Sequence, residues 1–320
     1  FVISYLLSKR IYSPVKKVLE GLKTSVTTDS NDRKNELTII HDAVNELIKK
    51  EKETDKLIDM NRKKLMESYI LRLITGQISD ADVDPDFLDE YCACFVISID
   101  RYKAFSSKYT LEEQYYYKSL ILKVCDEVIN MHAKGMGMLI ETKEIVYIAS
   151  LNKEYQQDFR KIAKTICEKI FDEISVIKDL SVSIGVGKLY NSRKDIRNSY
   201  LEAKKALQYR LLFGNKCVVY YEDIKDRDVA YVFPVEKESH IINFLKSDLY
   251  DELRMTLNEL INDLYNSINK KISYESVIKT IIQLISRTID YMVSKNIDMN
   301  GISTDSSNIY FELMELETID

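Results

Sequence analysis

Residues Tyr91–Asp100 read Tyr-Cys-Ala-Cys-Phe-Val-Ile-Ser-Ile-Asp, and residues Leu180–Gly187 read Leu-Ser-Val-Ser-Ile-Gly-Val-Gly. Both stretches are short, rich in β-branched or aromatic residues and flanked by helical patterns, which is typical of strands. Between them the sequence predicts a helix, a β-hairpin over Met138–Ser150 and a second helix. We therefore expect the two stretches to be strands of one sheet in an α/β domain.

The composition indicates a folded protein with more than one domain. Of the 320 residues, 45% are apolar and 30% are charged. With only 3 Pro and 8 Gly, long helices with few breaks are expected. The net charge of -5 gives no overall attraction to nucleic acid. A basic cluster occurs only near the N-terminus, at Lys9, Arg10, Lys16, Lys17 and Lys23.

The cysteines are predicted to be buried and reduced. They are Cys92, Cys94, Cys125, Cys167 and Cys217. Cys92 and Cys94 alternate along a strand and so share a face, and small hydrophobic residues in a reducing compartment are favoured over disulfides. The 3 histidines are scattered, and no spacing indicates a metal site.

Residues 1–10 resemble the end of a transmembrane helix. The 7 mostly apolar residues Phe1–Leu7 are too few to span a bilayer, which takes about 20. Lys9 and Arg10 follow almost at once, as in the positive-inside pattern. We interpret residues 1–10 as the cytoplasmic end of a membrane helix, which predicts a protein at the cell membrane with this region cytoplasmic. The alternative is an ordinary helix start on a domain surface.

Residues 11–50 resemble a HAMP linker. Pro14 precedes a short amphipathic helix, a polar connector covers residues 24–34, and Glu36 opens a second helix. In that second helix, apolar residues recur at the spacing of a coiled-coil seam, which predicts a homodimer. The seam residues are Leu37, Ile40, Val44 and Leu47.

Residues 51–78 are interpreted as a signalling helix that continues from the seam. The charged residues 51–56 interrupt the apolar pattern, which then returns at Ile58, Leu65, Tyr69 and Leu73. A paired helix can pass a rotation or a register shift along its axis. The alternative is a solvated spacer helix.

Residues 90–224 resemble a nucleotidyl-cyclase-like domain of the GGDEF type. The Val-Ser-Ile-Gly-Val sequence within Leu180–Gly187 and the helix Ser199–Leu207, Ser-Tyr-Leu-Glu-Ala-Lys-Lys-Ala-Leu, carry the resemblance. The helix is similar to one in degenerate GGDEF-like domains of bacterial regulators. The resemblance implies an α+β fold in which this central domain has a mainly antiparallel sheet and helical regions precede and follow it.

The catalytic residues of that family are not matched. Alignment on Lys103 places Ser98 where the family has a metal-binding Asp, and Asp100 at its second Asp; a hydroxyl is a poor ligand for Mg²⁺. The hairpin turn reads Glu141-Thr-Lys-Glu144 in place of Gly-Gly-Asp-Glu-Phe, and we expect both glutamates to be exposed turn residues. The Arg-x-x-Asp product-binding element is absent before this turn. We therefore predict no catalytic, cofactor-binding or metal-binding residues.

Residues 232–320 are predicted to be helical. The opening Phe233–Glu238, Phe-Pro-Val-Glu-Lys-Glu, resembles the helical segment of large membrane-anchored AraC-type regulators, which leads into two helix-turn-helix motifs. No recognition helix occurs before Asp320, so DNA contact is expected only through a domain absent from this chain. The alternative is a generic helical bundle packed on the α/β domain.

Together these features predict the signal-relaying, non-catalytic cytoplasmic region of a membrane-bound bacterial transcription regulator of the AraC type. Two other functions remain open. One is a diguanylate cyclase with unusual residues, and the other is a pseudo-enzyme domain that binds a nucleotide without turnover. No cofactor is expected, and the expected partner is a second copy of the chain.

Overall fold

The computed structural model describes residues 36–77, 88–140, 143–177, 180–231, 234–266, 271–295 and 317–318. Its contacts divide the chain into two units, Phe1–Met66 and Glu67–Asp320. The predicted membrane segment and the first HAMP-like helix lie outside the described residues, as do residues 296–316 of the predicted helical segment. Among the helices in the described ranges, none combines the length and the apolar character that crossing a membrane requires.

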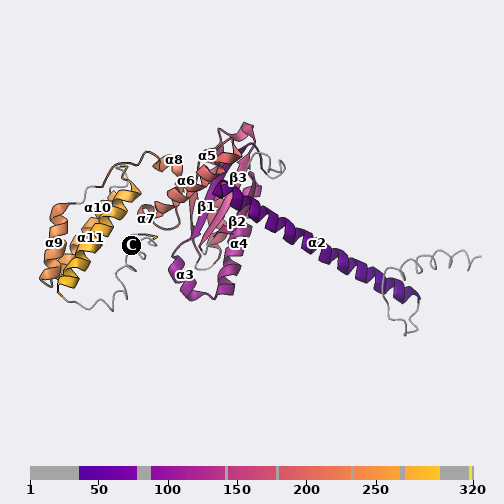
Figure 1. Cartoon of the computed structure of the whole chain (residues 1–320), viewed down its shortest axis with the longest axis horizontal. Coiled ribbons are helices and arrows are strands. Elements are labelled where there is room, and N and C mark those ends of the chain that lie inside the picture. The colour runs from indigo at the N-terminus through magenta and orange to yellow at the C-terminus, as the bar shows by residue number, and fades with distance from the viewer. Residues whose placement is uncertain are drawn as a thin grey trace, which may run out of the picture. The chain divides into compact units, whose positions relative to one another are not determined.

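Helix α2, Glu36–Thr75, is one continuous helix of 40 residues (Figure 1). It continues through the charged stretch that interrupts the apolar pattern, because Glu and Lys are good helix formers and pairs such as Glu46–Lys50 lie one turn apart. Val44 and Leu47 are exposed along it. In its last turns Ile70, Leu73 and Ile74 are buried instead, so the end of α2 packs within the second unit.

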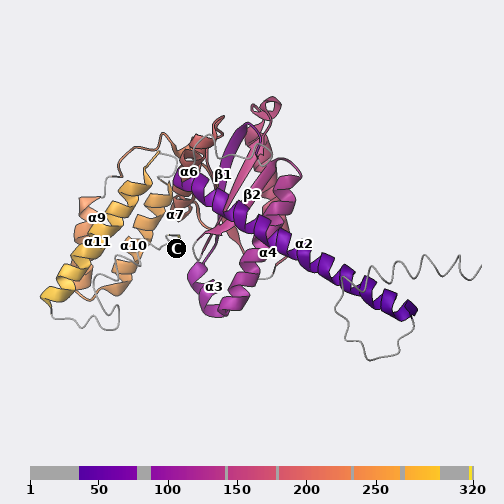
Figure 2. The ribbon, with the colours of Figure 1, turned by 45° about the vertical axis from the view of Figure 1, so that its right-hand side comes forward.

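The α/β domain is built on a five-stranded sheet with the order β2-β3-β1-β4-β5. Figure 2 shows this sheet with β1 and β2 labelled. At its centre β1, Tyr91–Ile99, pairs antiparallel with both β3, Glu144–Leu151, and β4, Val182–Val186. Strand β2, Lys134–Ile140, forms the hairpin with β3, while β5, Val218–Tyr220, runs parallel to β4. The predicted mainly antiparallel sheet is confirmed, and the two stretches that open the sequence analysis are neighbouring strands.

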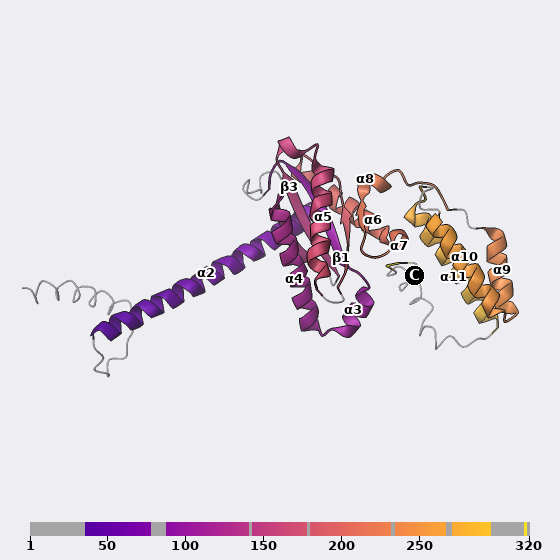
Figure 3. The same cartoon turned by 180° about the vertical axis from the view of Figure 1, so that it is seen from behind.

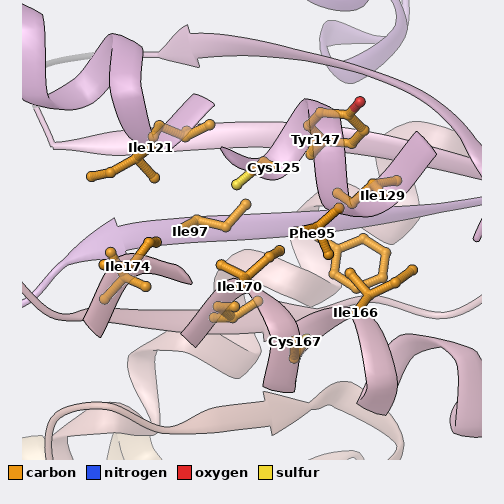
Figure 4. Packing of buried hydrophobic residues seen from close by; sticks show 14 of the residues in the cluster. Phe95, Ile97, Ile121, Cys125, Ile129, Tyr147, Ile166, Cys167, Ile170 and Ile174 are labelled. Carbon is orange, nitrogen blue, oxygen red and sulfur yellow. The ribbon is translucent and has the colours of Figure 1, made fainter. Parts of the chain in front are cut away.

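Helices α4, Leu111–Asn130, and α5, Phe159–Ser175, cover one face of this sheet (Figure 3). Their buried residues pack against Phe95 and Ile97 of β1 (Figure 4). In α5 the residues Ile166, Ile170 and Ile174 recur one turn apart and are buried. In α4 the face turned to the sheet carries Ile121, Cys125, Val128 and Ile129.

Helix α6, Ile196–Gln208, covers the opposite face and lies unusually close to β4. A Cβ atom on Gly185 would lie 2.1 Å from the carbonyl oxygen of Ala203, and one on Gly187 would lie 2.0 Å from that of Ser199. Ser199 also accepts a hydrogen bond at Oγ from the N–H of Cys94, at 2.8 Å. The glycines of the Ser-Ile-Gly-Val-Gly sequence therefore let the backbone of α6 rest directly on the sheet.

Two elements near the end of the domain are short. Strand β5 has only 3 residues, because the short helix α8, Tyr221–Ile224, begins at once. Helix α6 ends at Gln208 and is followed by the separate short helix α7, Arg210–Phe213. Helix α7 ends at Gly214, where a φ of 80° favours glycine.

The C-terminal helices α9, Val235–Lys246, α10, Tyr250–Asn266, and α11, Tyr274–Ser294, confirm the predicted helical segment. A hydrophobic cluster joins α10 and α11 to α6 and α7 of the α/β domain; it includes Ala206, Tyr209, Leu211, Leu212, Leu264, Ile272, Val277 and Ile278. Leu249 is 41% exposed because it lies beyond the end of α9.

The cysteines are free thiols, as predicted. Four are buried, and Cys217 is half-buried. Cys92 and Cys94 lie on the same face of β1, next to α6. Burial raises the pKa of the Cys92 thiol to about 12, so this thiol is not ionised near neutral pH and serves as a small apolar residue.

Candidate functional site

A row of polar side chains crosses the sheet beneath α6. Ser98 of β1 lies directly between Glu144 of β3 and Ser183 of β4. Residues opposite one another in an antiparallel pair point to the same face, here the one that Gly185 turns to α6. All three side chains are buried. The position that corresponds to a metal ligand in cyclases is thus enclosed between the sheet and a helix.

Asp100 follows β1 directly, and its side chain is fully buried. Its Oδ1 accepts hydrogen bonds from Ser183 Oγ at 2.6 Å and from Arg210 Nη1 at 3.1 Å. Its Oδ2 accepts one from the N–H of Lys216 at 2.9 Å. A buried carboxylate is stable only with such partners. Both oxygens of Asp100 are therefore occupied by groups of the chain itself, from β4, α7 and the loop before β5.

Glu144 is buried, and the prediction that it is an exposed turn residue is wrong. It is the first residue of β3 and is only 9% exposed, because the strand reaches back to Ser98. Lys204 of α6 lies 3.4 Å from its Oε2, an ion pair without hydrogen-bond geometry. Glu141, the other glutamate of the turn, lies outside the described residues.

Asp100 and Glu144 are thus paired separately, one with a basic residue of α7 and the other with a basic residue of α6. Among the described residues, no group of three or more His, Cys, Asp or Glu side chains is arranged to hold a metal ion. The sequence-based prediction names Asp100 and Glu144 without giving either acid a role, and it does not point to Lys204 or Arg210. Their partners lie 60 and 110 residues away in the chain, so no local pattern connects them.

A cavity of 580 Å³ opens beside Asp100. It lies between the short helix α3, Tyr102–Lys108, and the loops that precede β4 and β5. Its lining combines basic and aromatic side chains, which include Arg101, Lys108, Lys216, Phe105 and Tyr109. This chemistry suits a small anion with an apolar part.

Helix α6 also contacts residues that precede the α/β domain in the sequence and residues that follow it. Near its start, Arg197 lies against Gly76, which follows α2: a Cβ atom there would be 2.9 Å from Arg197 Cδ. Near its end, Lys205 Nζ lies 2.9 Å from Glu275 Oε1 of α11, and this hydrogen bond raises the pKa of Lys205. Tyr209, just beyond α6, accepts a hydrogen bond at its hydroxyl from the N–H of Tyr274, at 3.2 Å.

Comparison with known proteins identifies the central domain. Residues 87–209 match the family model described as a GGDEF-like domain. Over 339 aligned residues the chain is 20% identical to the uncharacterized HTH-type transcriptional regulator YtdP of Bacillus subtilis. That alignment covers 100% of this chain and 42% of YtdP, so the chain spans less than half of that relative.

Two solved structures share low sequence identity with the chain. The active GGEEF domain of a diguanylate cyclase from Vibrio cholerae is 16% identical, with a TM-score of 0.33, over 41% of this chain and 83% of that one. An EAL/GGDEF domain protein from M. capsulatus is 14% identical, with a TM-score of 0.31, over 48% of this chain and 93% of that one. From the matched residues and the sheet described above, the chain contains a GGDEF-like domain.

Proposed function

We propose that this chain is the non-catalytic, signal-relaying region of a membrane-bound bacterial transcription regulator of the AraC type. One observation carries the proposal: the buried carboxylates Asp100 and Glu144 are each paired with a basic residue of α6 or α7. Two-metal phosphoryl transfer needs carboxylates that face an open site. In this domain the two carboxylates instead form ion pairs that hold α6 and α7 against the sheet.

The match to a GGDEF-like domain and the distant similarity to an HTH-type regulator support a regulatory role. The membrane anchor and the HAMP-like linker rest on the resemblance of residues 1–50 alone, and the AraC assignment rests on that of residues 232–320. DNA would then be bound by a domain outside this chain. A sequence-specific, salt-resistant complex between residues 1–320 and DNA in a shift assay would contradict this part of the proposal.

The proposed relay runs through α6. This helix cannot move away from β4 without loss of the close backbone contact at Gly185 and Gly187, so it moves with the sheet as one body. It contacts Gly76 after α2 at one end and α11 at the other. A displacement at the end of α2 would therefore reach the C-terminal helices through a packed element rather than through a loop.

We propose that the relay receives its signal through a homodimer of α2. The two helices would pair along the seam of Leu37, Ile40, Val44 and Leu47. Val44 and Leu47 are 44% and 52% exposed, and the side chains of Leu37 and Ile40 lie outside the described ones. In the same heptad numbering Ile58 and Leu65 also fall on the seam, and both are exposed. These described seam residues are thus exposed and available to pair with a second copy of α2.

The buried residues at the end of α2 lie on its other side. With Val44 and Leu47 at positions a and d, the numbering places Ile70, Leu73 and Ile74 at positions f, b and c, opposite the seam. One face of the helix can therefore pair with a second copy while the other face remains packed in its own domain.

Incubation of the chain with GTP and Mg²⁺ or Mn²⁺ tests the non-catalytic assignment. We expect no cyclic dinucleotide by chromatography. Product that forms with the wild-type chain and disappears in Glu144→Gln, with an unchanged circular dichroism spectrum, would establish the cyclase instead. Glu144 is preferred to Asp100 for this test because its partner Lys204 is 37% exposed, whereas Asp100 and its partner Arg210 are both buried.

The cavity beside Asp100 favours one alternative, nucleotide binding without turnover. Calorimetry with guanine and adenine nucleotides separates this from a purely mechanical relay. The relay predicts no heat of binding. Saturable binding that weakens at least tenfold in Lys216→Gln, with Lys123→Gln on the exposed side of α4 as the charge-matched control, would favour the nucleotide-binding domain.

A further inference from the structure

The polar lining of the 580 Å³ cavity gathers around Asp100. Lys216 donates its N–H to the Asp100 carboxylate at 2.9 Å, and Asp100 donates its own N–H to the carbonyl oxygen of Ser181 at 2.9 Å. Arg101 follows Asp100 in the sequence and also lines the cavity. Two loops and the end of β1 therefore bring two basic residues, Arg101 and Lys216, to the same part of the wall.

The side chains of these two basic residues are not used by the rest of the fold. Arg101 and Lys216 are exposed, and neither side chain forms an ion pair with another described residue. Both have a left-handed backbone, with φ values of 52° and 56°. Non-glycine residues adopt this conformation rarely, and such strain is concentrated at functional sites. Next to Lys216, the side-chain oxygen of Asn215 is buried and has no hydrogen-bond partner among the described residues.

The remaining wall of the cavity is largely apolar. Its side chains belong to the hydrophobic core or pack against it, namely Phe105, Tyr109, Ile177 and Leu180. Lys108 also lines this wall, with its ammonium group over the ring of Tyr109. The hydroxyl of Ser175 already donates to the carbonyl oxygen of Asp172 at 2.7 Å. This wall suits the apolar body of a ligand, whereas a polar nucleobase would lose its hydrogen bonds to water there.

The charges around Asp100 favour a ligand with a single negative charge. The guanidinium of Arg210 lies 3.1 Å from Asp100 and 3.7 Å from Glu317. Glu317 also accepts a hydrogen bond from the N–H of Arg101. With Arg101 and Lys216 included, the cations exceed the acids by one charge. One carboxylate balances that charge and matches the planar fork of a guanidinium. The several charges of a nucleoside triphosphate would exceed it and be repelled by the two acids.

We propose that this cavity binds a small organic monocarboxylate with an aromatic or branched aliphatic body. The carboxylate lies between the side chains of Arg101 and Lys216, and the body covers the wall formed by Phe105 and Leu180. Because Lys216 also binds Asp100, the ligand would act next to the Asp100–Arg210 ion pair and so provide a second input to the C-terminal helices. That consequence rests on the proposed relay, whereas binding itself does not.

Titration of the full chain with phenylacetate and with isovalerate tests the site. The amide resonances of Asn215 and Lys216, followed by NMR, should shift saturably with both probes. Phenylethanol has the same body without the charge, and acetate has the charge without the body. Each should bind at least about tenfold more weakly than phenylacetate, because it lacks one of the two sets of contacts. Added GTP should not displace phenylacetate.

Two variants locate the binding in the cavity. Lys216→Gln removes one cation, and Ala104→Trp fills the cavity from an exposed position of α3. Each should weaken phenylacetate binding by about tenfold or more. The controls should keep the wild-type affinity. They are Lys123→Gln on the exposed side of α4 and Ser107→Trp, an exposed residue of α3 outside the lining.

Three results would overturn the proposal. The first is the absence of saturable binding by both carboxylates up to about 10 mM. The second is equal affinity for phenylethanol and phenylacetate, and the third is displacement of phenylacetate by GTP. None of these results depends on whether α2 and α11 are coupled, so failure of the site and failure of the relay are distinguishable.

Discussion

Arg210 is the residue on which the contacts of the candidate site converge. It binds Asp100 on one side and Glu317 on the other, and it begins α7, which joins the α/β domain to the C-terminal helices. Its guanidinium geometry suits two separate acceptors, whereas a lysine would present only a single ammonium. The residue that makes the site stable is therefore also the residue that connects it to the rest of the chain.

Replacement of Arg210 by Met should destabilise the domain by about 3 kcal/mol, because it leaves the buried Asp100 carboxylate without its cation. Urea denaturation measures the loss. Lys204→Met is the matched control at the second ion pair. Its lysine is 37% exposed, so we expect a loss of only about 1 kcal/mol there. Equal losses for the two variants would contradict the different burial of the two pairs.

Replacement of Gly185 by Ala should cost about 3 kcal/mol, because the new Cβ would press on the backbone of α6. The clash involves the carbonyl oxygen of Ala203 at 2.1 Å, which cannot rotate away as a side chain can. Leu201→Ala, at a half-exposed position of the same helix, is the control and should change stability by about 0.5 kcal/mol or less. A neutral effect of Gly185→Ala in thermal unfolding would show that α6 is free to shift.

At the residue scale, the sequence draws attention to Asp100 through its alignment with the family, but it predicts Glu144 to be an exposed turn residue. The burial of Glu144 could not be predicted, because a turn of Glu-Thr-Lys-Glu leaves open where β3 begins. The basic partners of the two acids have no local sequence signal. Glu317 likewise has no local feature that predicts its contact with α3, and only the folded chain brings it there.

Among the elements, α6 has the most varied contacts. It packs on β1 and β4, its start lies next to Gly76, and Lys205 and Tyr209 at its end contact α11. The sequence predicts this helix, and its buried residues Ala203 and Leu207 follow the helical period. Its division from α7 is not predictable, because the residues from Tyr209 to Phe213 have ordinary helix-forming side chains and only tertiary packing redirects them.

Replacement of Tyr209 by Phe should loosen the connection between the α/β domain and α11. It removes the acceptor of the Tyr274 N–H at the first turn of α11, where no intrahelical partner exists. We expect a loss of about 1 kcal/mol and faster amide exchange in the first turn of α11. Tyr274→Phe is the control, because it keeps both the N–H and the ring contact with Tyr209. Equal effects of the two variants would show that the hydroxyl of Tyr209 is not the linking group.

For the whole molecule, the sequence predicts the order of helices and strands more reliably than their contacts. The sheet, the flanking helices and the helical C-terminal segment were all anticipated, because each has a strong apolar period or a strand-like composition. The continuous helix α2 also agrees with the helices predicted on both sides of residues 51–56, since the charged residues that interrupt an apolar seam do not break a helix.

Replacement of Leu47 by Arg should convert the proposed dimer to monomer. The seam would then bring two guanidinium groups together at position d, where an apolar pair is required. Sedimentation analysis of the full chain measures the change. Lys49→Glu, at position f on the other side of the same helix, is the control and should retain the dimer. A monomeric wild-type chain, or a dimeric Leu47→Arg variant, would contradict the role of the seam.

The relay itself is tested most directly by a disulfide that locks α2 of two chains in different rotations. In Leu47→Cys the disulfide lies on the seam. Ile48 is the next residue and is also exposed. A disulfide in Ile48→Cys therefore requires each α2 helix to rotate about its axis relative to the seam-paired arrangement. The measurement is the rate of amide exchange at Tyr274 and in α6, compared between the disulfide-bridged dimer and the reduced chain of each variant. We predict slow exchange with the bridge at position 47 and at least about tenfold faster exchange at Tyr274 with the bridge at position 48. Identical exchange in both bridged dimers and in the reduced chains would contradict the relay.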